Sequence, residues 1–181
     1  MKVCIYGLGA VGGLLAARIA RSGQPVAAVA RGATLEAVRR EGLRLLEREG
    51  DAERSSVARI QASDRPADLG VQDLVVLAVK TTSLAAVARE IAPLLGPDTA
   101  VLSAMNGVPW WFFHGLPGRH AALRLDSVDP DGAIERAIAP RRVIGCVVHL
   151  SSGAGAPAVV RHAFGDRLIL GEPDGSRSER C

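Results

Sequence analysis

Three glycines near the start of the chain, Gly7, Gly9 and Gly12, have the spacing of a dinucleotide-binding turn. They follow a short apolar run and precede an apolar pattern with helical periodicity. In such a turn the first glycine allows a tight bend, the second lets the main chain approach a pyrophosphate, and the third lets the helix lie against the strand. The helix N-terminus adds free N–H groups and partial positive charge. The residues predicted to bind the dinucleotide are Gly7, Leu8, Gly9, Ala10, Val11 and Gly12.

An arginine follows the second apolar run, within Val29-Ala30-Arg31-Gly32. Folds of this type that bind NAD have an acidic residue about 20 positions past the glycines, which accepts hydrogen bonds from the adenosine ribose. A guanidinium there can instead bind a 2′-phosphate. Arg31 therefore predicts NADPH in preference to NADH. The alternative is that Arg31 is an ordinary solvated surface residue.

Two further polar residues directly follow buried apolar runs: Lys80 after residues 74–79, and Asn106 shortly after residues 100–103. Ligands of open α/β sheets bind outside the carboxyl ends of the strands, so these side chains are candidates for the nicotinamide and substrate side. Lys80 is one of two lysines in a chain that otherwise uses arginine for positive charge. The alternatives are a solvated lysine at a helix start and a plain Asn-Gly turn.

The elements that must position these residues alternate between strand-like and helix-like patterns. Strands are predicted before Gly7 and at residues 25–30, 73–79 and 100–103. Helices are predicted at residues 10–21, at 33–41, and from a Thr82-Ser83 cap to Leu95, with Gly96-Pro97 ending the last one. A hairpin is expected at residues 43–46 and 57–60, with the charged residues 47–54 at its solvated tip. This alternation predicts an α/β fold with a doubly wound, Rossmann-like parallel sheet.

The last third of the chain changes character. Residues 143–151, 158–163 and 167–170 are strand-like and are separated by Gly-rich or charged turns, which predicts an antiparallel β extension of the sheet. From Glu172 onward the composition is polar, without an apolar residue before Cys181. We therefore expect one domain over residues 1–172, followed by a polar tail or the start of an interdomain linker at 173–181.

Composition limits the classes of function. The net charge is only +3, the arginines are interleaved with acidic residues, and aromatic residues make up 3% of the chain, which disfavours a nucleic-acid partner. Three scattered cysteines make a disulfide framework or a metal site improbable and favour a reducing, cytoplasmic location. No stretch approaches the length of a membrane span. A signal peptide over the first 20 residues is disfavoured by the glycine spacing and by Arg18 and Arg21.

Several segments, in the same order along the chain, resemble one known family. They are Gly7-Leu-Gly-Ala-Val-Gly12, Ala30-Arg31-Gly32 with Arg40-Glu-Gly-Leu43, Val79-Lys80, Asn106-Gly-Val-Pro109, Gly145-Cys-Val-Val-His149 and Gly171-Glu-Pro173. Together they are similar to the N-terminal half of ketopantoate reductases, the 2-dehydropantoate 2-reductases. The resemblance covers the chain to about residue 173.

The resemblance implies that NADPH is held by residues 7–12 and Arg31, with Lys80 and Asn106 lining the nicotinamide and substrate side. It also implies a cofactor contact near Ser151, although Leu150-Ser151 stands where the family usually has small alanines. Met105 likewise stands where a glutamine is common. His149 is interpreted as a strand residue, because the family does not use it in catalysis.

The reaction implied is NADPH-dependent reduction of the ketone of a 2-oxo acid, ketopantoate to pantoate, in pantothenate biosynthesis. In this family the lysine that donates the proton and a glutamate that binds substrate lie in a C-terminal helical domain. This chain stops before that domain, so the resemblance implies no catalytic residue within it. We expect the chain to supply the cofactor-binding half and to be inactive alone.

Two alternatives to this hypothesis remain open. The chain could be a stand-alone NADPH-binding or regulatory module without chemistry, or a dehydrogenase of the 6-phosphogluconate type, which fits Lys80 and Asn106 less well. As an enzyme half it would require a complementing C-terminal domain, and it could also form a homodimer. The aromatic residues 110–113 are either an exposed surface for such a partner or part of the core.

Overall fold

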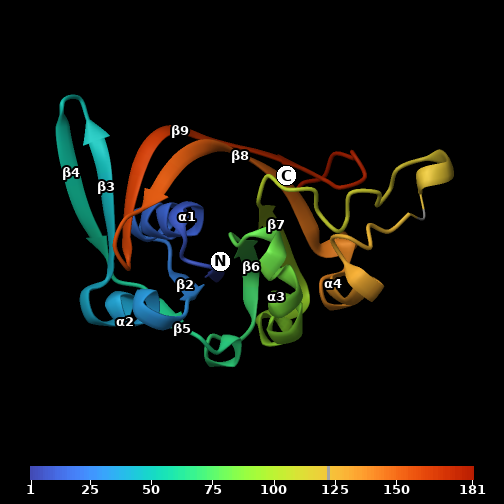
Figure 1. Cartoon of the computed structure of the whole chain (residues 1–181), viewed down its shortest axis with the longest axis horizontal. Helices are drawn as coiled ribbons and strands as arrows, with labels where there is room; N and C mark the ends of the chain where they lie inside the picture. Colours follow the sequence, from blue (N-terminus) through green and yellow to red (C-terminus); the bar gives the residue numbers. More distant parts are fainter. Residues whose placement is uncertain (122) are drawn as a thin grey trace.

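A nine-stranded sheet forms the centre of the computed structural model, which describes residues 1–121 and 123–181 (Figure 1). The strands are β1 (Val3–Tyr6), β2 (Val26–Val29), β3 (Leu43–Glu49), β4 (Ala52–Ala58), β5 (Gln61–Ser63), β6 (Gln72–Leu77), β7 (Leu95–Ala104), β8 (Val143–Ala154) and β9 (Val159–Gly171). The helices are α1 (Ala10–Arg21), α2 (Gly32–Glu41), α3 (Leu84–Glu90) and α4 (Ala133–Ala137). The strand order is β4-β3-β9-β8-β7-β6-β1-β2-β5.

The sheet has a parallel part and an antiparallel extension, as the sequence predicts. Every neighbouring pair from β5 through β2, β1, β6 and β7 to β8 is parallel. The pairs β8–β9 and β3–β4 are antiparallel, and β3 and β9 join these two hairpins in parallel. The doubly wound, Rossmann-like fold class is thereby confirmed.

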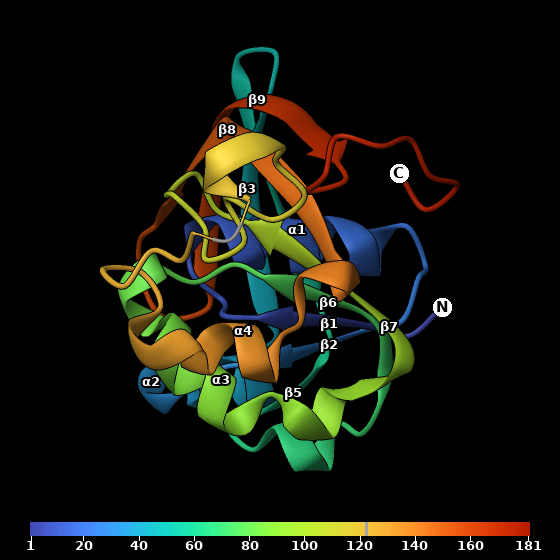
Figure 2. The same ribbon diagram turned by 90° about the vertical axis from the view of Figure 1, so that its right-hand side faces the viewer.

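Successive side chains of β1 point to opposite faces of the sheet and pack in two separate core clusters. Val3 and Ile5 pack in the cluster that includes residues of α1 and α2, whereas Cys4 and Tyr6 pack in the cluster that includes residues of α3 and α4. All four are at most 3% exposed. A strand covered on both faces can be apolar throughout, which explains why the run before Gly7 lacks the polar alternation of a surface strand. Figure 2 shows α3 and α4 side by side over the same face.

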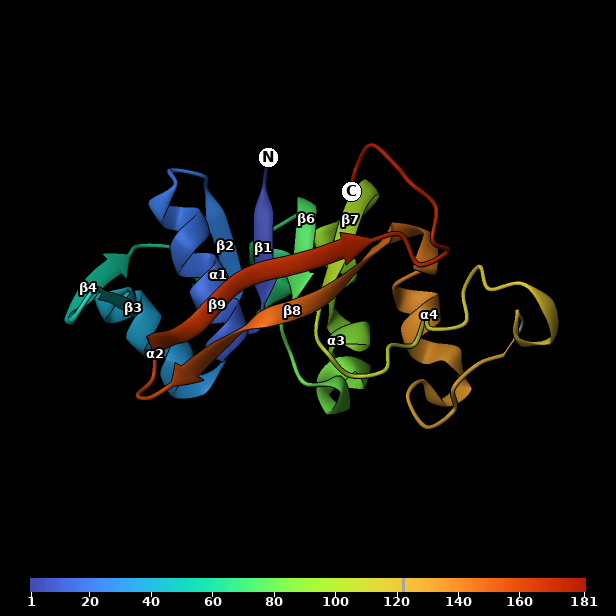
Figure 3. The same ribbon diagram turned by 90° about the horizontal axis from the view of Figure 1, so that it is seen from above.

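Strands β8 and β9 form a long arch over helix α1, seen from above in Figure 3. The arch starts beside β7, where residues 143–146 pair with residues 101–104, and ends beside β3. Helix α1 thus lies between the parallel sheet and this β8–β9 arch. A Cβ atom on Gly12 would come within 1.9 Å of the Gly7 carbonyl oxygen, and one on Gly13 within 2.5 Å of Val160 Cγ2. Two consecutive glycines therefore let both layers approach α1.

The two strands predicted at residues 158–163 and 167–170 are one strand, β9. The strand passes through Gly165, whose φ is +73°, opposite a register shift between His149 and Ser152 of β8. A Cβ atom at Gly165 would lie 2.7 Å from the His149 carbonyl oxygen. The glycine that was interpreted as a turn is therefore a bulge that bends a continuous strand.

The predicted helix from Thr82 to Leu95 is also wrong in its limits. Helix α3 begins at Leu84, after a single 3₁₀ turn, and the hydroxyls of Thr82 and Ser83 do not cap it. It ends at Glu90 because Pro93, within a second 3₁₀ turn, lacks the N–H that would continue it. Gly96-Pro97 lies inside β7, where Thr99 Oγ1 accepts a hydrogen bond from Gly96 N at 2.8 Å.

The charged hairpin is longer than predicted. Residues that were assigned to a solvated tip belong to β3 and β4, which pair from Leu43–Ala58 out to Glu49–Ala52. An edge hairpin that projects into solvent carries charge along its strands, as the ion pair between Arg54 and Glu49 at 3.4 Å illustrates. The short elements β5 and α4 were not predicted.

The polar tail is held by ionic contacts. Arg180 donates two hydrogen bonds to the carboxylate of Glu172, at 2.7 and 2.5 Å, and one to the Val143 carbonyl at 3.2 Å. The Arg180 guanidinium lowers the pKa of Glu172 to about 2, against the opposing effect of burial. The tail therefore folds back on the start of β8 without any apolar anchor.

Candidate functional site

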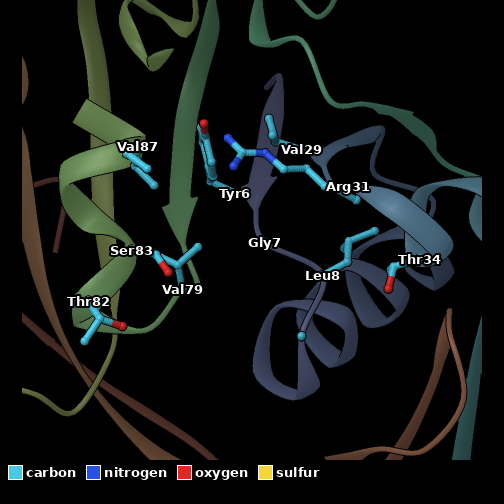
Figure 4. A pocket seen from close by; sticks show the side chains of 13 residues that line it. Tyr6, Gly7, Leu8, Val29, Arg31, Thr34, Val79, Thr82, Ser83 and Val87 are labelled. Carbon is cyan, nitrogen blue, oxygen red and sulfur yellow. The ribbon is translucent and has the colours of Figure 1, made fainter. Parts of the chain in front are cut away.

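A cavity of about 480 Å³ opens at the carboxyl ends of β1, β2 and β6 (Figure 4). It lies between the glycine turn, the loop that leads into α2, and one side of α3. The lining residues are Tyr6, Gly7, Leu8, Gly9, Val29, Ala30, Arg31, Thr34, Val79, Thr82, Ser83, Ala86 and Val87. We call this space the adenosine-side cavity, after the half of the dinucleotide that the sequence predicts next to Arg31.

Each glycine of the turn has the geometry that the motif requires. Gly7 has a φ of +100°, and its N–H donates to the Val29 carbonyl at 3.0 Å, so the chain turns sharply out of β1. Gly12 allows α1 to pack directly on Gly7. Gly9 differs, because a Cβ atom there would meet no described atom within 4 Å. The missing side chain of Gly9 thus leaves open space at the mouth of the turn, as a diphosphate requires.

The N-terminus of helix α1 faces this space. Gly9 is its N-cap, and none of the described side chains caps the helix or adds an acidic group to its first turn. A helix of this length presents uncompensated N–H groups and partial positive charge at that end. The turn therefore fits the diphosphate of a dinucleotide, which would be held by main-chain N–H groups of residues 9–12.

Arg31 lies at the other end of the adenosine-side cavity. Figure 4 shows its side chain extending across the cavity toward Tyr6. Its guanidinium forms an ion pair with Glu90 of α3, and the Tyr6 hydroxyl donates a hydrogen bond to the same carboxylate at 3.2 Å. Burial and the neighbouring Glu90 raise the pKa of Tyr6 to about 12. Arg31 thus stands where the sequence placed it, but it already has an anionic partner.

A second cavity of about 440 Å³ continues the groove from Gly9 toward the ends of β6 and β7. Ala10, Val11, Lys80 and Asn106 all line it. Lys80 is exposed at the end of the loop after β6. The amide of Asn106 binds the main chain of β8, donating to the Val148 carbonyl at 3.0 Å and accepting from Val148 N at 2.8 Å. Asn106 therefore fixes the arch at the edge of this cavity.

A third cavity of about 510 Å³ shares Met105, Asn106 and Gly107 with the second. It is bordered by exposed apolar side chains, among them Phe112, Val147, Ile169 and Leu170, each between 44% and 48% exposed. Trp110, by contrast, is buried and donates to the Ile138 carbonyl at 3.2 Å. The aromatic cluster at 110–113 thus divides between the core and an exposed apolar surface.

The structure brings most of the predicted site residues to one groove. Gly7, Leu8, Gly9 and Arg31 line the adenosine-side cavity, and Ala10, Val11, Lys80 and Asn106 line the second. Gly12 lies beneath the turn. Ser151, on the β8–β9 arch, is absent from the described lining of the three cavities, so its contact with cofactor stays a prediction.

Sequence reasoning missed the polar residues that reach the adenosine-side cavity from other elements. Tyr6 at the end of β1 carried the same signal as Lys80, a polar group at a strand end, and could have been found. Thr82 and Ser83 were interpreted as a helix cap. Glu90 had no local signal, because only the packing of α3 beside β1 brings it to Arg31.

The chemistry available in the groove is that of anion binding. Two of the cysteines are poor nucleophiles, because burial raises the pKa of Cys4 to about 12 and that of Cys146 to about 11. Over residues 1–121 and 123–181, no three His, Cys, Asp or Glu side chains are grouped to hold a metal ion, and no helix is long and apolar enough to cross a membrane. The groove instead offers main-chain N–H groups, one guanidinium and one ammonium.

Comparison with known proteins agrees with this geometry. Residues 3–110 match the family model described as "Ketopantoate reductase PanE/ApbA". A 2-dehydropantoate 2-reductase of Mesorhizobium japonicum is 50% identical over 181 residues, which cover 99% of this chain and 54% of that protein. The chain therefore spans about half the length of this relative.

Solved structures show the same architecture. A crystal structure of a protein from Ralstonia solanacearum MolK2 superposes with a TM-score of 0.91 at 50% identity, covering 98% of this chain and 54% of that one. D-mandelate dehydrogenase, solved with NADH, superposes with a TM-score of 0.72 over 99% of this chain and 49% of that one. At 18% identity the latter shows a shared fold only.

Proposed function

Because the chain belongs to the ketopantoate reductase PanE/ApbA family, we propose that it binds NADPH and supplies the cofactor-binding half of a 2-oxo acid reductase. The substrate implied by the Mesorhizobium relative is 2-dehydropantoate, that is, ketopantoate. The chain covers about half of that relative, so both the complete reaction and its substrate belong to what we propose.

The observation that carries this proposal is the geometry of Gly9. Its main chain lies at the N-terminus of α1, and the position of its missing Cβ atom is open. The adenosine-side cavity lies on one side of this point and the second cavity on the other, so Gly9 borders both. A groove with an anion-binding centre and two arms fits a dinucleotide better than a compact ligand.

Each arm has residues suited to one half of the cofactor. In the adenosine-side cavity, the Arg31 guanidinium can form two parallel hydrogen bonds to a 2′-phosphate. In the second cavity, the Lys80 ammonium provides positive charge for the carboxylate of a 2-oxo acid, and Asn106 holds β8 in place beside it. The bound nicotinamide would supply the hydride that reduces the ketone.

We further propose that turnover requires polypeptide equivalent to the second half of the relatives. The second cavity is open to solvent along Lys80, and the apolar third cavity continues it as an exposed surface. A reductase site must exclude water around the reacting atoms. A segment that packs on this apolar surface would close the groove and contribute the proton donor.

The test is titration of the 181-residue chain with NADPH and with NADH, followed by nicotinamide fluorescence. We expect NADPH to bind more tightly, and Arg31→Ala to weaken NADPH about 10-fold or more while leaving NADH nearly unchanged, because a charge-assisted hydrogen bond contributes about 1.5–3 kcal/mol. Arg54→Ala, which removes an arginine from the β3–β4 hairpin, is the matched control.

Measuring the turnover of ketopantoate by the same chain, alone and with an added second half, distinguishes half of a reductase from a stand-alone binding module. We expect oxidation of NADPH to stay at background with the chain alone. Equal affinity of the wild type for NADPH and NADH would refute the assignment of Arg31, and rapid turnover would refute the requirement for a second half. NADPH binding that no added second half converts into turnover would favour the stand-alone binding module.

A further inference from the structure

A carboxylate and a guanidinium form an ion pair beside the adenosine-side cavity. Arg31 comes from the loop before α2, and Glu90 is the last residue of α3, on the opposite side. Ala86 and Val87, one turn earlier in α3, line the cavity itself. Figure 4 shows the Arg31 side chain reaching over the cavity toward Tyr6, whose hydroxyl donates to Glu90. Arg31, which lines the cavity, is therefore paired with Glu90 at the end of the groove where a 2′-phosphate would bind Arg31.

Stability of the fold does not account for this pair. The side chains of Arg31 and Glu90 are 55% and 44% exposed, and ion pairs at such positions contribute little to folding. A glutamate at the C-terminal end of a helix also lies at the negative end of the helix dipole, which disfavours it. Tyr6, which is 3% exposed, nevertheless holds the carboxylate in place by donating a hydrogen bond to it.

We infer that Glu90 is a specificity-determining residue, whose carboxylate competes with the cofactor 2′-phosphate for Arg31 and thereby limits the preference for NADPH over NADH. This inference rests on the proposed function. Both anions accept hydrogen bonds from the same guanidinium, so the 2′-phosphate of NADPH competes with the Glu90 carboxylate for the N–H groups of Arg31 and binds near a like charge. NADH lacks the 2′-phosphate and meets no such competition.

The charge of Glu90 can be removed with little change of shape by Glu90→Gln. The 2′-phosphate carries a charge of about −1.5 to −2, and a carboxylate within about 6 Å in a solvated site repels it. Without this repulsion the variant should bind NADPH about 3- to 10-fold more tightly. The dissociation constant of NADH should stay within about twofold, and the gain for NADPH should shrink in 1 M salt. Glu90→Ala should behave in the same way.

Glu49→Gln is the matched control. It removes one carboxylate that also pairs with an arginine, Arg54, on the hairpin far from the groove. We expect its NADPH affinity to equal that of the wild type. In the Arg31→Ala background, Glu90→Gln should increase NADPH affinity by less than it does in the wild type, because the two anions no longer compete for a guanidinium.

The outcomes distinguish this inference from the proposed function. If the wild type binds NADPH and Glu90→Gln binds it equally or more weakly, the carboxylate orients Arg31 and the competition is refuted while the proposed function stands. If Glu90→Gln binds NADPH and NADH more tightly by the same factor, the competition is also refuted, because the loss of a negative charge would then act on both cofactors without the 2′-phosphate. If the wild type binds neither dinucleotide, the proposed function fails and this inference fails with it.

Discussion

Substituting alanine for Gly9 and for Gly12 should weaken NADPH binding in both cases but should strongly destabilise the fold only at Gly12. The two residues belong to one motif and lie three positions apart, yet their surroundings differ completely. A Cβ atom at Gly9 would meet open space among the described residues, whereas one at Gly12 would come within 1.9 Å of the Gly7 carbonyl oxygen. The pair therefore separates the cost of losing the phosphate site from the cost of disturbing the fold.

For Gly9→Ala the fold should tolerate the methyl group. Gly9 has φ −75° and ψ −164°, an extended conformation that any residue adopts. Alanine is a poorer N-cap than glycine, which costs about 0.5–1 kcal/mol and about 1–4 °C in Tm. The methyl group occupies the space that a diphosphate needs, and losing one charge-assisted hydrogen bond costs about 1.5–3 kcal/mol. NADPH affinity should therefore fall about 10- to 100-fold.

For Gly12→Ala the fold should not tolerate the methyl group. The atom that it meets is main chain, so no side chain can rotate away, and α1 must move from β1. Helix α1 cannot move far, because the β8–β9 arch covers its other side. Overpacking of this kind costs about 1–3 kcal/mol or more, which corresponds to a Tm lower by about 2–12 °C.

The two properties are measured separately, by thermal unfolding followed by circular dichroism and by fluorescence titration with NADPH. Both variants should bind NADPH weakly, but only Gly12→Ala should show a large loss of stability. If Gly9→Ala binds NADPH like the wild type, the diphosphate does not rest on the turn and the reasoning fails. If Gly12→Ala is as stable as Gly9→Ala, the argument that α1 packs too closely on Gly7 to admit a methyl group is refuted.

Two further predictions concern the surroundings of the groove. Asn106→Ala should lower the free energy of unfolding by about 1–3 kcal/mol, because the main-chain groups of Val148 lose both hydrogen bonds. Urea denaturation measures this change. An unchanged midpoint would show that these contacts do not stabilise the fold. In the native protein at pH 8, a thiol reagent should label Cys181 quickly and the other two cysteines slowly, because Cys4 and Cys146 are buried and have raised pKa values. Rapid labelling of all three cysteines would contradict the packing around β1 and β8.

The parallel part of the fold could be predicted because its signals are local. The apolar run before Gly7 and the glycine spacing fixed a strand, a turn and a helix within 21 residues. Polar groups at strand ends then indicated the groove, because parallel strands bring their carboxyl ends to one edge. Arg31, Lys80 and Asn106 are predicted in this way, and each lines a cavity of the groove, while their contacts with cofactor or substrate stay predictions.

The remaining features depend on contacts between distant segments. Glycine is typical of turns and also of bulges, and only the pairing of β9 with β8 shows that Gly165 belongs to the second class. The amide of Asn106 resembled a turn residue until Val148 of β8 came beside it. Glu90 is an ordinary helix-end residue in the sequence, and its place beside Arg31 follows from how α3 packs on β1.

The enclosure of α1 between two layers has a consequence for the order of folding. Residues 159–161 of β9 pair with residues 44–46 of β3, and Val160 packs against Gly13, so the end of the chain completes the surroundings of its beginning. Contacts of such large sequence separation form late and slowly. During synthesis helix α1 therefore stays uncovered on one side until β9 has emerged, and a nascent chain that ends before residue 159 cannot complete the packing around Gly13.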